Sequence, residues 1–82
     1  MLTLKIVSPE RVEFDGEVES VLVPGTLGSF EILNDHAPII STLDKGVVEY
    51  GLPQGQKVQL AILGGFVEVQ QNVVSLCVEV NE

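Results

Sequence analysis

The sequence has few of the residues on which most enzyme chemistry and nucleic-acid binding depend. It contains no tryptophan, one cysteine, one histidine and four basic residues against twelve acidic ones, which gives a net charge of −8. Nucleic-acid binding needs basic side chains that neutralise phosphates, and an anionic membrane surface would repel this chain. We therefore expect no nucleic-acid partner and no insertion into lipid. A basic protein surface is the partner that this charge favours.

Cysteines and long apolar runs are scarce as well. The lone Cys77 cannot form a disulfide within the chain, which suits a reducing compartment. The longest mostly apolar stretch, LAILGGFV at residues 60–67, is far shorter than the roughly 20 residues of a membrane-spanning helix. A metal site would also lack ligands, because neither His36 nor Cys77 has a second ligand at a matching spacing.

No catalytic motif is present. Ser29 or Ser41 could be combined with His36 and Asp35 into a hydrolytic triad on paper, but adjacent Asp and His side chains usually diverge and no nucleophile elbow accompanies them. The glycine pair at residues 64–65 is not followed by the Lys-Ser/Thr of a phosphate-binding loop. We expect no catalytic residue, no metal and no cofactor.

What the chain does have is alternating apolar residues. Hydrophobic residues make up 45% of its 82 positions, and they are largely valine, leucine and isoleucine, which favour strands. Period-2 runs extend from residues 2–7 to residues 73–80, and no segment keeps helical spacing. The pattern predicts one all-β domain over residues 1–82, an antiparallel β-sandwich (a flattened barrel) of two sheets with about 8–10 short strands.

Turn residues divide this pattern into strands. Asp15-Gly16 and Asp44-Lys45-Gly46 predict hairpin tips, and Asn72 is expected near a third turn. Gly64-Gly65 predicts a break or bulge.

The alternation also predicts an outward-facing set. If the alternating apolar residues of the last three runs face inward, their neighbours face outward; that outward set is Phe66, Val73 and Val47, together with Glu49 and Glu68. A patch that mixes apolar and acidic residues can be a docking face. It can equally belong to a second packed layer or be ordinary surface.

One stretch is similar to lipoyl and biotinyl carrier domains. These are flattened β-sandwiches of similar size in which a lysine at a hairpin tip is modified, and Lys45 stands between Asp44 and Gly46. Aspartate and glycine are also ordinary hairpin residues. A plain solvated turn lysine is therefore the simpler interpretation of Lys45.

Two longer stretches resemble the epsilon subunit of F-type ATP synthases. They are VPGTLGSFEILNDHAPIISTLDKGVVEY and AILGGFVEVQQNVVSL, and the similarity runs from about Leu2 to Val80. The matching positions are Gly25, Gly28, Phe30, Ile32, Leu33, His36, Ala37, Pro38, Gly46, Gly64, Gly65, Phe66, Glu68, Val69 and Asn72.

The resemblance implies a mechanical role for the domain. It implies the family's N-terminal sandwich of two antiparallel sheets, a non-catalytic subunit in the rotor's central stalk. That subunit binds gamma and rests on the polar loops of the c-ring, so that proton-driven rotation is coupled to ATP synthesis. The location implied is the cytoplasmic face of an energy-transducing membrane, peripheral to it.

The resemblance also implies two interfaces. The loop facing the c-ring corresponds to Leu27, Gly28 and Ser29 together with His36. The gamma-facing positions are Ser8, Ile40, Ser41, Val47, Leu63 and Glu68.

The sequence departs from the family pattern in two places. Ser29 stands where the family often has an acidic residue, and Asn34-Asp35 stands where Pro-Gly or Pro-Asn is commoner, so we expect a more mobile loop there. Asp35 or Glu31 is then expected to supply the negative charge toward a basic ring loop. The family's C-terminal helical hairpin, which can inhibit ATP hydrolysis, is expected to be lacking, because the sequence stops at Glu82.

Overall fold

The alternating pattern forms strands throughout. The computed structural model describes residues 1–81, and within that range the regular elements are nine strands and no helix. Their bounds are β1 Leu2–Val7, β2 Val12–Val18, β3 Ser20–Val23, β4 Phe30–Ile32, β5 Ile39–Leu43, β6 Gly46–Gly51, β7 Lys57–Ile62, β8 Gly64–Gln70 and β9 Val73–Glu79. The predicted number of strands is confirmed.

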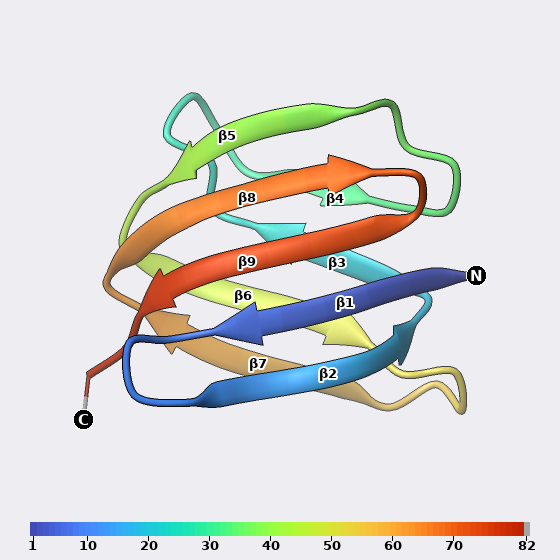
Figure 1. Ribbon diagram of the computed structural model, residues 1–82, viewed down its shortest axis with the longest axis horizontal. Helices are drawn as coiled ribbons and strands as arrows, with labels where there is room; N and C mark the ends of the chain where they lie inside the picture. Colours follow the sequence, from blue (N-terminus) through green and yellow to red (C-terminus); the bar gives the residue numbers. More distant parts are fainter. Residues whose placement is uncertain (82) are drawn as a thin grey trace.

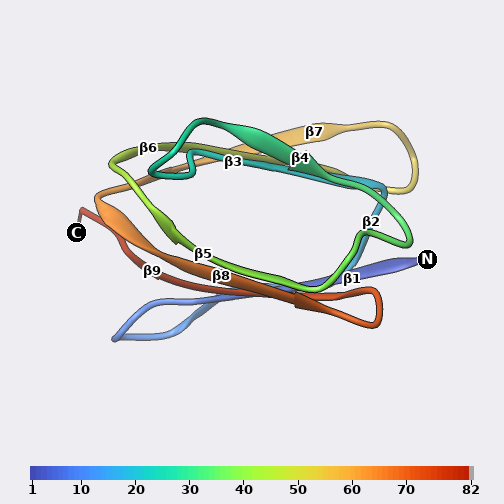
Figure 2. The ribbon, with the colours of Figure 1, turned by 90° about the horizontal axis from the view of Figure 1, so that it is seen from above.

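The strands form two layers. A five-stranded sheet has the order β2-β1-β9-β8-β5, and a four-stranded sheet has the order β4-β3-β6-β7. Figure 1 looks onto the five-stranded sheet with the other sheet behind it, and Figure 2 shows the two layers edge-on. The predicted sandwich is confirmed, although the sheets do not close into a true barrel. The core between them is aliphatic, with Leu4, Ile6, Val21, Ile32 and Leu76 fully buried.

One strand pair differs from the antiparallel expectation. β1 runs antiparallel to β2 but parallel to β9, with Leu4 opposite Val74 and Ile6 opposite Leu76. Parallel neighbours need a long connection, and here the remaining seven strands supply it. Because β1 and β9 are the first and last strands, their pairing joins the two ends of the chain inside one sheet.

Asp15-Gly16 is not a hairpin tip, and that prediction was wrong. Both residues lie inside β2, opposite Lys5 and Leu4 of β1. The turn is at residues 8–11 instead, where the Ser8 amide donates to the Arg11 carbonyl at 2.9 Å. The Asp-Gly preference for tight turns yielded to the register that buries Val18 beside Leu2.

The chain changes sheet at four places. These are Glu19, residues 33–38, residues 44–45 and Leu63, each between consecutive strands that belong to different sheets. Lys45 therefore lies at a corner between sheets and not at a hairpin tip, so that prediction was also wrong. The break predicted at Gly64-Gly65 lies one residue earlier, at Leu63, and the two glycines are the first residues of β8, paired with Glu79 and Val78 of β9.

An aromatic pair closes the sandwich between β2 and β6. The ring of Tyr50 packs against Phe14 at a centroid distance of 4.5 Å. Burial, and secondarily the nearby Glu13 carboxylate, raises the pKa of Tyr50 above its ordinary value. The folded state therefore favours the neutral phenol.

This shift predicts a loss of stability at alkaline pH. The contribution of Tyr50 is complete below about pH 10, where an unfolded-state tyrosine titrates, and it is lost as the pH rises through the higher folded-state pKa. Tyr50→Phe should flatten this decline in urea unfolding measured from pH 8 to pH 11. An identical decline in the variant and the wild type would assign it to other groups.

Candidate docking surfaces

On the outer face of the five-stranded sheet, the strand register places side chains of neighbouring strands side by side in rows. One row crosses all five strands through Asp15, Lys5, Ser75, Glu68 and Ile40. Ile40 is 73% exposed, although it is a large apolar residue. This face therefore combines an exposed aliphatic side chain with a carboxylate directly beside it.

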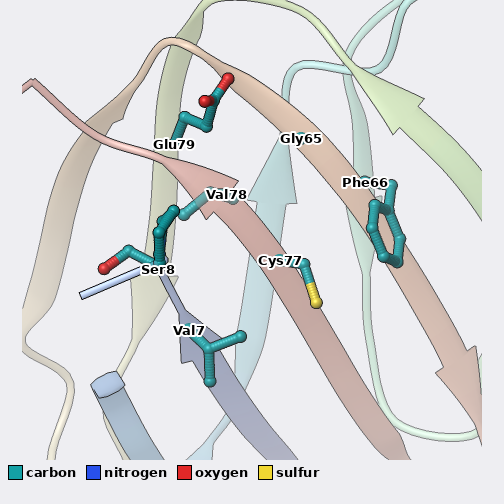
Figure 3. A pocket seen from close by; sticks show the side chains of 8 residues that line it. Val7, Ser8, Gly65, Phe66, Cys77, Val78 and Glu79 are labelled. Carbon is teal, nitrogen blue, oxygen red and sulfur yellow. The ribbon is translucent and has the colours of Figure 1, made fainter. Parts of the chain in front are cut away.

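The next row is more apolar and ends in a pocket. It runs through Val7, Cys77, Phe66 and Thr42, and Phe66 is 47% exposed. Figure 3 shows Phe66 and Cys77 on adjacent strands of this face, with Ser8 and Glu79 toward its end. The pocket has a volume of about 380 Å³ and its lining includes all four of these residues. Exposed apolar surface of this kind is typical of protein contacts.

The predicted outward set is confirmed residue by residue but not as one surface. Phe66, Val73 and Glu68 lie on the five-stranded sheet, whereas Val47 and Glu49 lie on the outer face of the four-stranded sheet. The prediction that they share one side was therefore wrong. Parity along a strand tells inside from outside, but it does not tell which sheet a strand joins.

The positions that the resemblance assigns to the gamma contact fall into two groups. Ile40 is directly opposite Glu68 in the β5–β8 pair, whereas Ser41, the next residue of β5, is opposite the buried Val67 and therefore points to the other side of the sheet. The other group lies at the end of the sandwich where β1 ends and β8 begins (left in Figure 1). It consists of Ser8, Leu63 and Val47.

The second group is tied together by the end of β9. The Leu63 amide donates to the Glu79 carbonyl at 2.7 Å, and Leu63 and Val47 line one pocket of about 340 Å³. The Ser8 hydroxyl lies 3.0 Å from Glu13 Oε2 and 3.2 Å from the Arg11 carbonyl, so it also stabilises the β1–β2 turn.

The positions that the resemblance assigns to the c-ring contact lie along one edge of the sandwich, where β4 and β5 are the outermost strands of the two sheets. Figure 2, seen from above, shows this edge nearest the viewer, with the β3–β4 loop at one end and the β4–β5 loop at the other. Leu27 at the first loop is fully exposed, and Ser29 in the same loop is also exposed. Gly28 has φ of 131°, a conformation that few residues other than glycine adopt.

The first loop is bonded firmly to β5. The Thr26 amide donates to the Thr42 carbonyl at 3.1 Å, and the two threonine hydroxyls are 2.9 Å apart. The Asp44 amide donates to the Pro24 carbonyl at 2.8 Å. Leu27 is thus presented from a fixed base.

The second loop is held too, contrary to the mobility expected from Asn34-Asp35. The Asp35 amide donates to Asn72 Oδ1 at 2.6 Å, and Asn72 Nδ2 donates to Asp35 Oδ1 at 3.2 Å. Proline is therefore not needed to restrain this turn. The Asp35 carboxylate is engaged within the chain, while Glu31 is exposed on β4.

The Asp35–Asn72 pair is the feature that sequence reasoning missed. The two residues are 37 positions apart, and no local pattern predicts which turns meet. The available signal was conformational, because Asp and Asn are the non-glycine residues that most readily adopt positive φ. Both do so here, with φ of 66° and 62°.

Other kinds of site find no support in the described part of the chain. Residues 1–81 hold no group of three or more His, Cys, Asp or Glu side chains placed to share a metal ion. Among the same residues, no helix has the length and apolar character needed to cross a membrane. The corner position of Lys45 also removes the hairpin geometry on which the carrier-domain interpretation depended.

Comparison with known proteins gives one consistent result. The family model for the ATP synthase delta/epsilon chain β-sandwich domain matches residues 1–82. The ATP synthase epsilon chain of Leptospira borgpetersenii is 43% identical over 76 residues, covering 92% of this chain and 58% of that protein. The epsilon chain of a Nostoc species is 38% identical over 82 residues, covering 99% of this chain and 60% of that protein. The chain thus spans somewhat more than half the length of these relatives.

Solved structures agree on the fold. A chain in the Euglena gracilis mitochondrial ATP synthase (OSCP/F1/c-ring) superposes with a TM-score of 0.89 at 24% identity, covering 94% of this chain and 49% of that one. A chain in the central stalk and c-ring of the Tetrahymena thermophila enzyme gives a TM-score of 0.78 at 18% identity, covering 95% and 63%.

Proposed function

This chain belongs to the ATP synthase delta/epsilon chain β-sandwich family, and from that premise we propose that it is a rotor subunit of an F-type ATP synthase. It joins the gamma subunit to the c-ring, so that ion-driven rotation is coupled to ATP synthesis in the catalytic head. The observation that carries the proposal is the family match over the whole chain, together with relatives named epsilon chain at 38–43% identity. The subunit itself performs no catalysis.

A closely packed sandwich suits this mechanical role. Interiors packed as densely as crystals have low compressibility and transmit strain. Here the two sheets share one aliphatic core, and the first and last strands pair inside the same sheet. A load applied at the ring-facing edge therefore reaches the opposite sheet without a hinge between domains.

The proposed gamma interface centres on the outer face of the five-stranded sheet. Ile40 and Glu68 lie together on this face, and Ser8 reaches the same face through the pocket that Phe66 lines. Ser41 is next to Ile40 on the edge strand β5, so it adjoins the contact from the side of the sheet that faces the core. Leu63 and Val47 continue around the end of the sandwich, which makes them the rim of the contact. An apolar centre with a polar rim is the usual anatomy of such interfaces.

The proposed ring-facing surface is the β4–β5 edge, with Leu27, Gly28, Ser29 and His36. An exposed leucine on a fixed loop can enter a gap between polar loops of neighbouring ring subunits. The proposed location is peripheral, on the cytoplasmic face of an energy-transducing membrane, with contact to protein and not to lipid. The net charge of −8 favours basic loops on the ring.

The function is tested by isolating the native protein with its partners. The chain should co-elute with gamma in gel filtration at one copy each, and intact-mass analysis should show an unmodified Lys45. A lipoyl or biotinyl mass on Lys45, with no gamma in the peak, would overturn the proposal in favour of a carrier domain.

Cross-linking tests the ring-facing edge separately. Ser29→Cys, placed in a Cys77→Ser background to remove the free thiol, should form a disulfide with a cysteine in the c-subunit polar loop of the assembled enzyme. Gln54→Cys, in the exposed β6–β7 loop, is the matched control. Equal cross-linking from both positions would contradict the proposed orientation.

A further inference from the structure

Three segments of the chain meet at Asn72. Gln71 and Asn72 form the two-residue turn between β8 and β9, with φ of 51° and 62°, which is the positive-φ geometry of a tight hairpin. The Asn72 carbonyl accepts a hydrogen bond from the Thr3 amide at 2.9 Å, next to the start of β1. The Asn72 side chain forms the two bonds to Asp35. One residue thus connects the β1 strand, the β8–β9 turn and the β4–β5 loop.

The Asp35 bonds act on a segment that passes between the sheets. Residues 33–38 carry the chain from β4 in one sheet to β5 in the other, and Asp35 has a φ of 66° within that passage. A left-handed conformation is unfavourable for a residue with a side chain unless its surroundings hold it. Asn72 supplies that restraint through an acceptor for the Asp35 amide and a donor for its carboxylate.

His36 depends on the same conformation. Its amide donates to the Leu33 carbonyl at 3.2 Å, and its ring Nδ1–H donates to the Ala37 carbonyl at 2.7 Å. The imidazole lies 6.4 Å from the Phe30 ring, measured between centroids, which places it over the β4–β5 edge. Rotation at Asp35 would move the imidazole away from Phe30, because Asp35 directly precedes it in the chain.

The other end of the edge is restrained in the same manner. The Thr26–Thr42 bonds hold the loop that carries Leu27 to β5, so both loops of this surface are tied to the five-stranded sheet. Their restraints are independent of each other, because one involves β5 and the other involves the β8–β9 turn. A surface fixed at both ends pays less conformational entropy when it binds.

We propose that Asn72 is a positioning residue for the partner contact of the β4–β5 edge. Through its paired hydrogen bonds with Asp35 it fixes the β4–β5 loop, and through that loop the His36 imidazole, in the geometry that contacts the c-ring. The inference rests on the proposed function for the identity of the partner. The new element is that Asn72, on the β8–β9 turn, controls the contact of the β4–β5 edge without touching the partner itself.

Exchanging the two side chains separates positioning from simple loss of a residue. Asn72→Asp replaces the donor Nδ2 by an acceptor that faces the Asp35 carboxylate. Asp35→Asn alone is tolerated, because the new amide can turn its oxygen toward Asn72 Nδ2. The double variant Asp35→Asn/Asn72→Asp keeps the bond from the residue-35 amide to a residue-72 side-chain oxygen, and it restores the side-chain bond with donor and acceptor exchanged. Gln70→Glu, at an exposed position of β8, controls for the added charge.

Two measurements compare these four variants with the wild type. One is amide hydrogen exchange at residues 35 and 36 in the purified chain, and the other is affinity for the complex of gamma and the c-ring. Asn72→Asp should speed exchange and weaken affinity, each about tenfold, which is the expected size for a side-chain hydrogen bond replaced by repulsion between two carboxylates. Asp35→Asn, the double variant and Gln70→Glu should stay within about threefold of wild type.

Two results would overturn the positioning role. One is faster exchange in Asn72→Asp with unchanged affinity, which would make Asn72 purely structural while the proposed function stands. The other is unchanged exchange in that variant, since the bonds would then not hold the loop. A wild-type chain that does not bind the complex would overturn the proposed function itself, and the positioning role with it.

Discussion

Replacing Gly65 with alanine should lower the free energy of unfolding by about 3–5 kcal/mol, the sum expected from overpacking and from backbone strain. A Cβ at this position would overlap the Cys77 carbonyl and lie 2.8 Å from the Cα of Val78. These are backbone atoms of the neighbouring strand β9, so no side chain can rotate to make room. The φ of 151° is in addition unfavourable for alanine.

A loss of this size is a large fraction of the free energy of unfolding of a small domain, which is roughly 5–15 kcal/mol. Gly64→Ala is the matched control, since Gly64 has a similar φ of 159° but its Cβ would meet only the Leu43 carbonyl at 3.6 Å, an ordinary contact, so the difference between the variants measures the overlap. Urea unfolding of the two variants should show a much lower midpoint for Gly65→Ala. Equal midpoints would mean that β8 and β9 are less closely apposed at this point than the structure shows.

Introducing a charge at Phe66 should produce the largest loss of gamma binding. Phe66 is 47% exposed and lies between Ile40 and Glu68 on one side and the pocket with Ser8 on the other. Phe66→Asp would bury a carboxylate in the apolar centre of the proposed interface. The expected loss is about 2 kcal/mol or more, a fall in affinity of about thirtyfold. The fold should change little, because the side chain is on the outer face.

Val47→Asp is the matched comparison on the other sheet. Val47 is 48% exposed, so the two variants expose similar apolar side chains to the same change. A rim position should cost about tenfold or less in affinity. Titration of the purified chain into gamma measures both. A greater loss for Val47→Asp would move the centre of the contact to the four-stranded face, and reduced stability in either variant would assign that residue to the core.

The strands could be predicted from the sequence because burial of one face imposes a period of two. The outward positions of Phe66, Val73 and Val47 followed from the same rule. The β8–β9 hairpin near Asn72 also followed from local pattern. In each of these cases the information lies within a few neighbouring residues.

What failed depended on contacts between distant segments. Asp15-Gly16 has the composition of a turn, but the pairing of β2 with β1 placed it inside a strand. Lys45 was assigned to a hairpin because Asp44 and Gly46 flank it, whereas β5 pairs with β8 in one sheet and β6 pairs with β3 and β7 in the other. The parallel β1–β9 pair and the Asp35–Asn72 bonds join segments that no local pattern connects.

The candidate interfaces could be predicted only through the resemblance of the sequence to a known family. Alternation identified exposed apolar residues, but it did not say which of two opposite sheets carried them. Carrying positions over from the family supplied the partners, and the structure then grouped those positions on one sheet face, one end and one edge. Physical reasoning from the structure added the restraints at the two ends of the edge.

Coupling is the central claim, and ATP-driven proton pumping measures it directly. Membrane vesicles from the source organism, stripped of their own epsilon subunit, should hydrolyse ATP without building a proton gradient. Adding the purified chain should restore the gradient, because gamma and the c-ring would again turn together. Binding of the chain to these vesicles with no recovery of pumping would contradict the account.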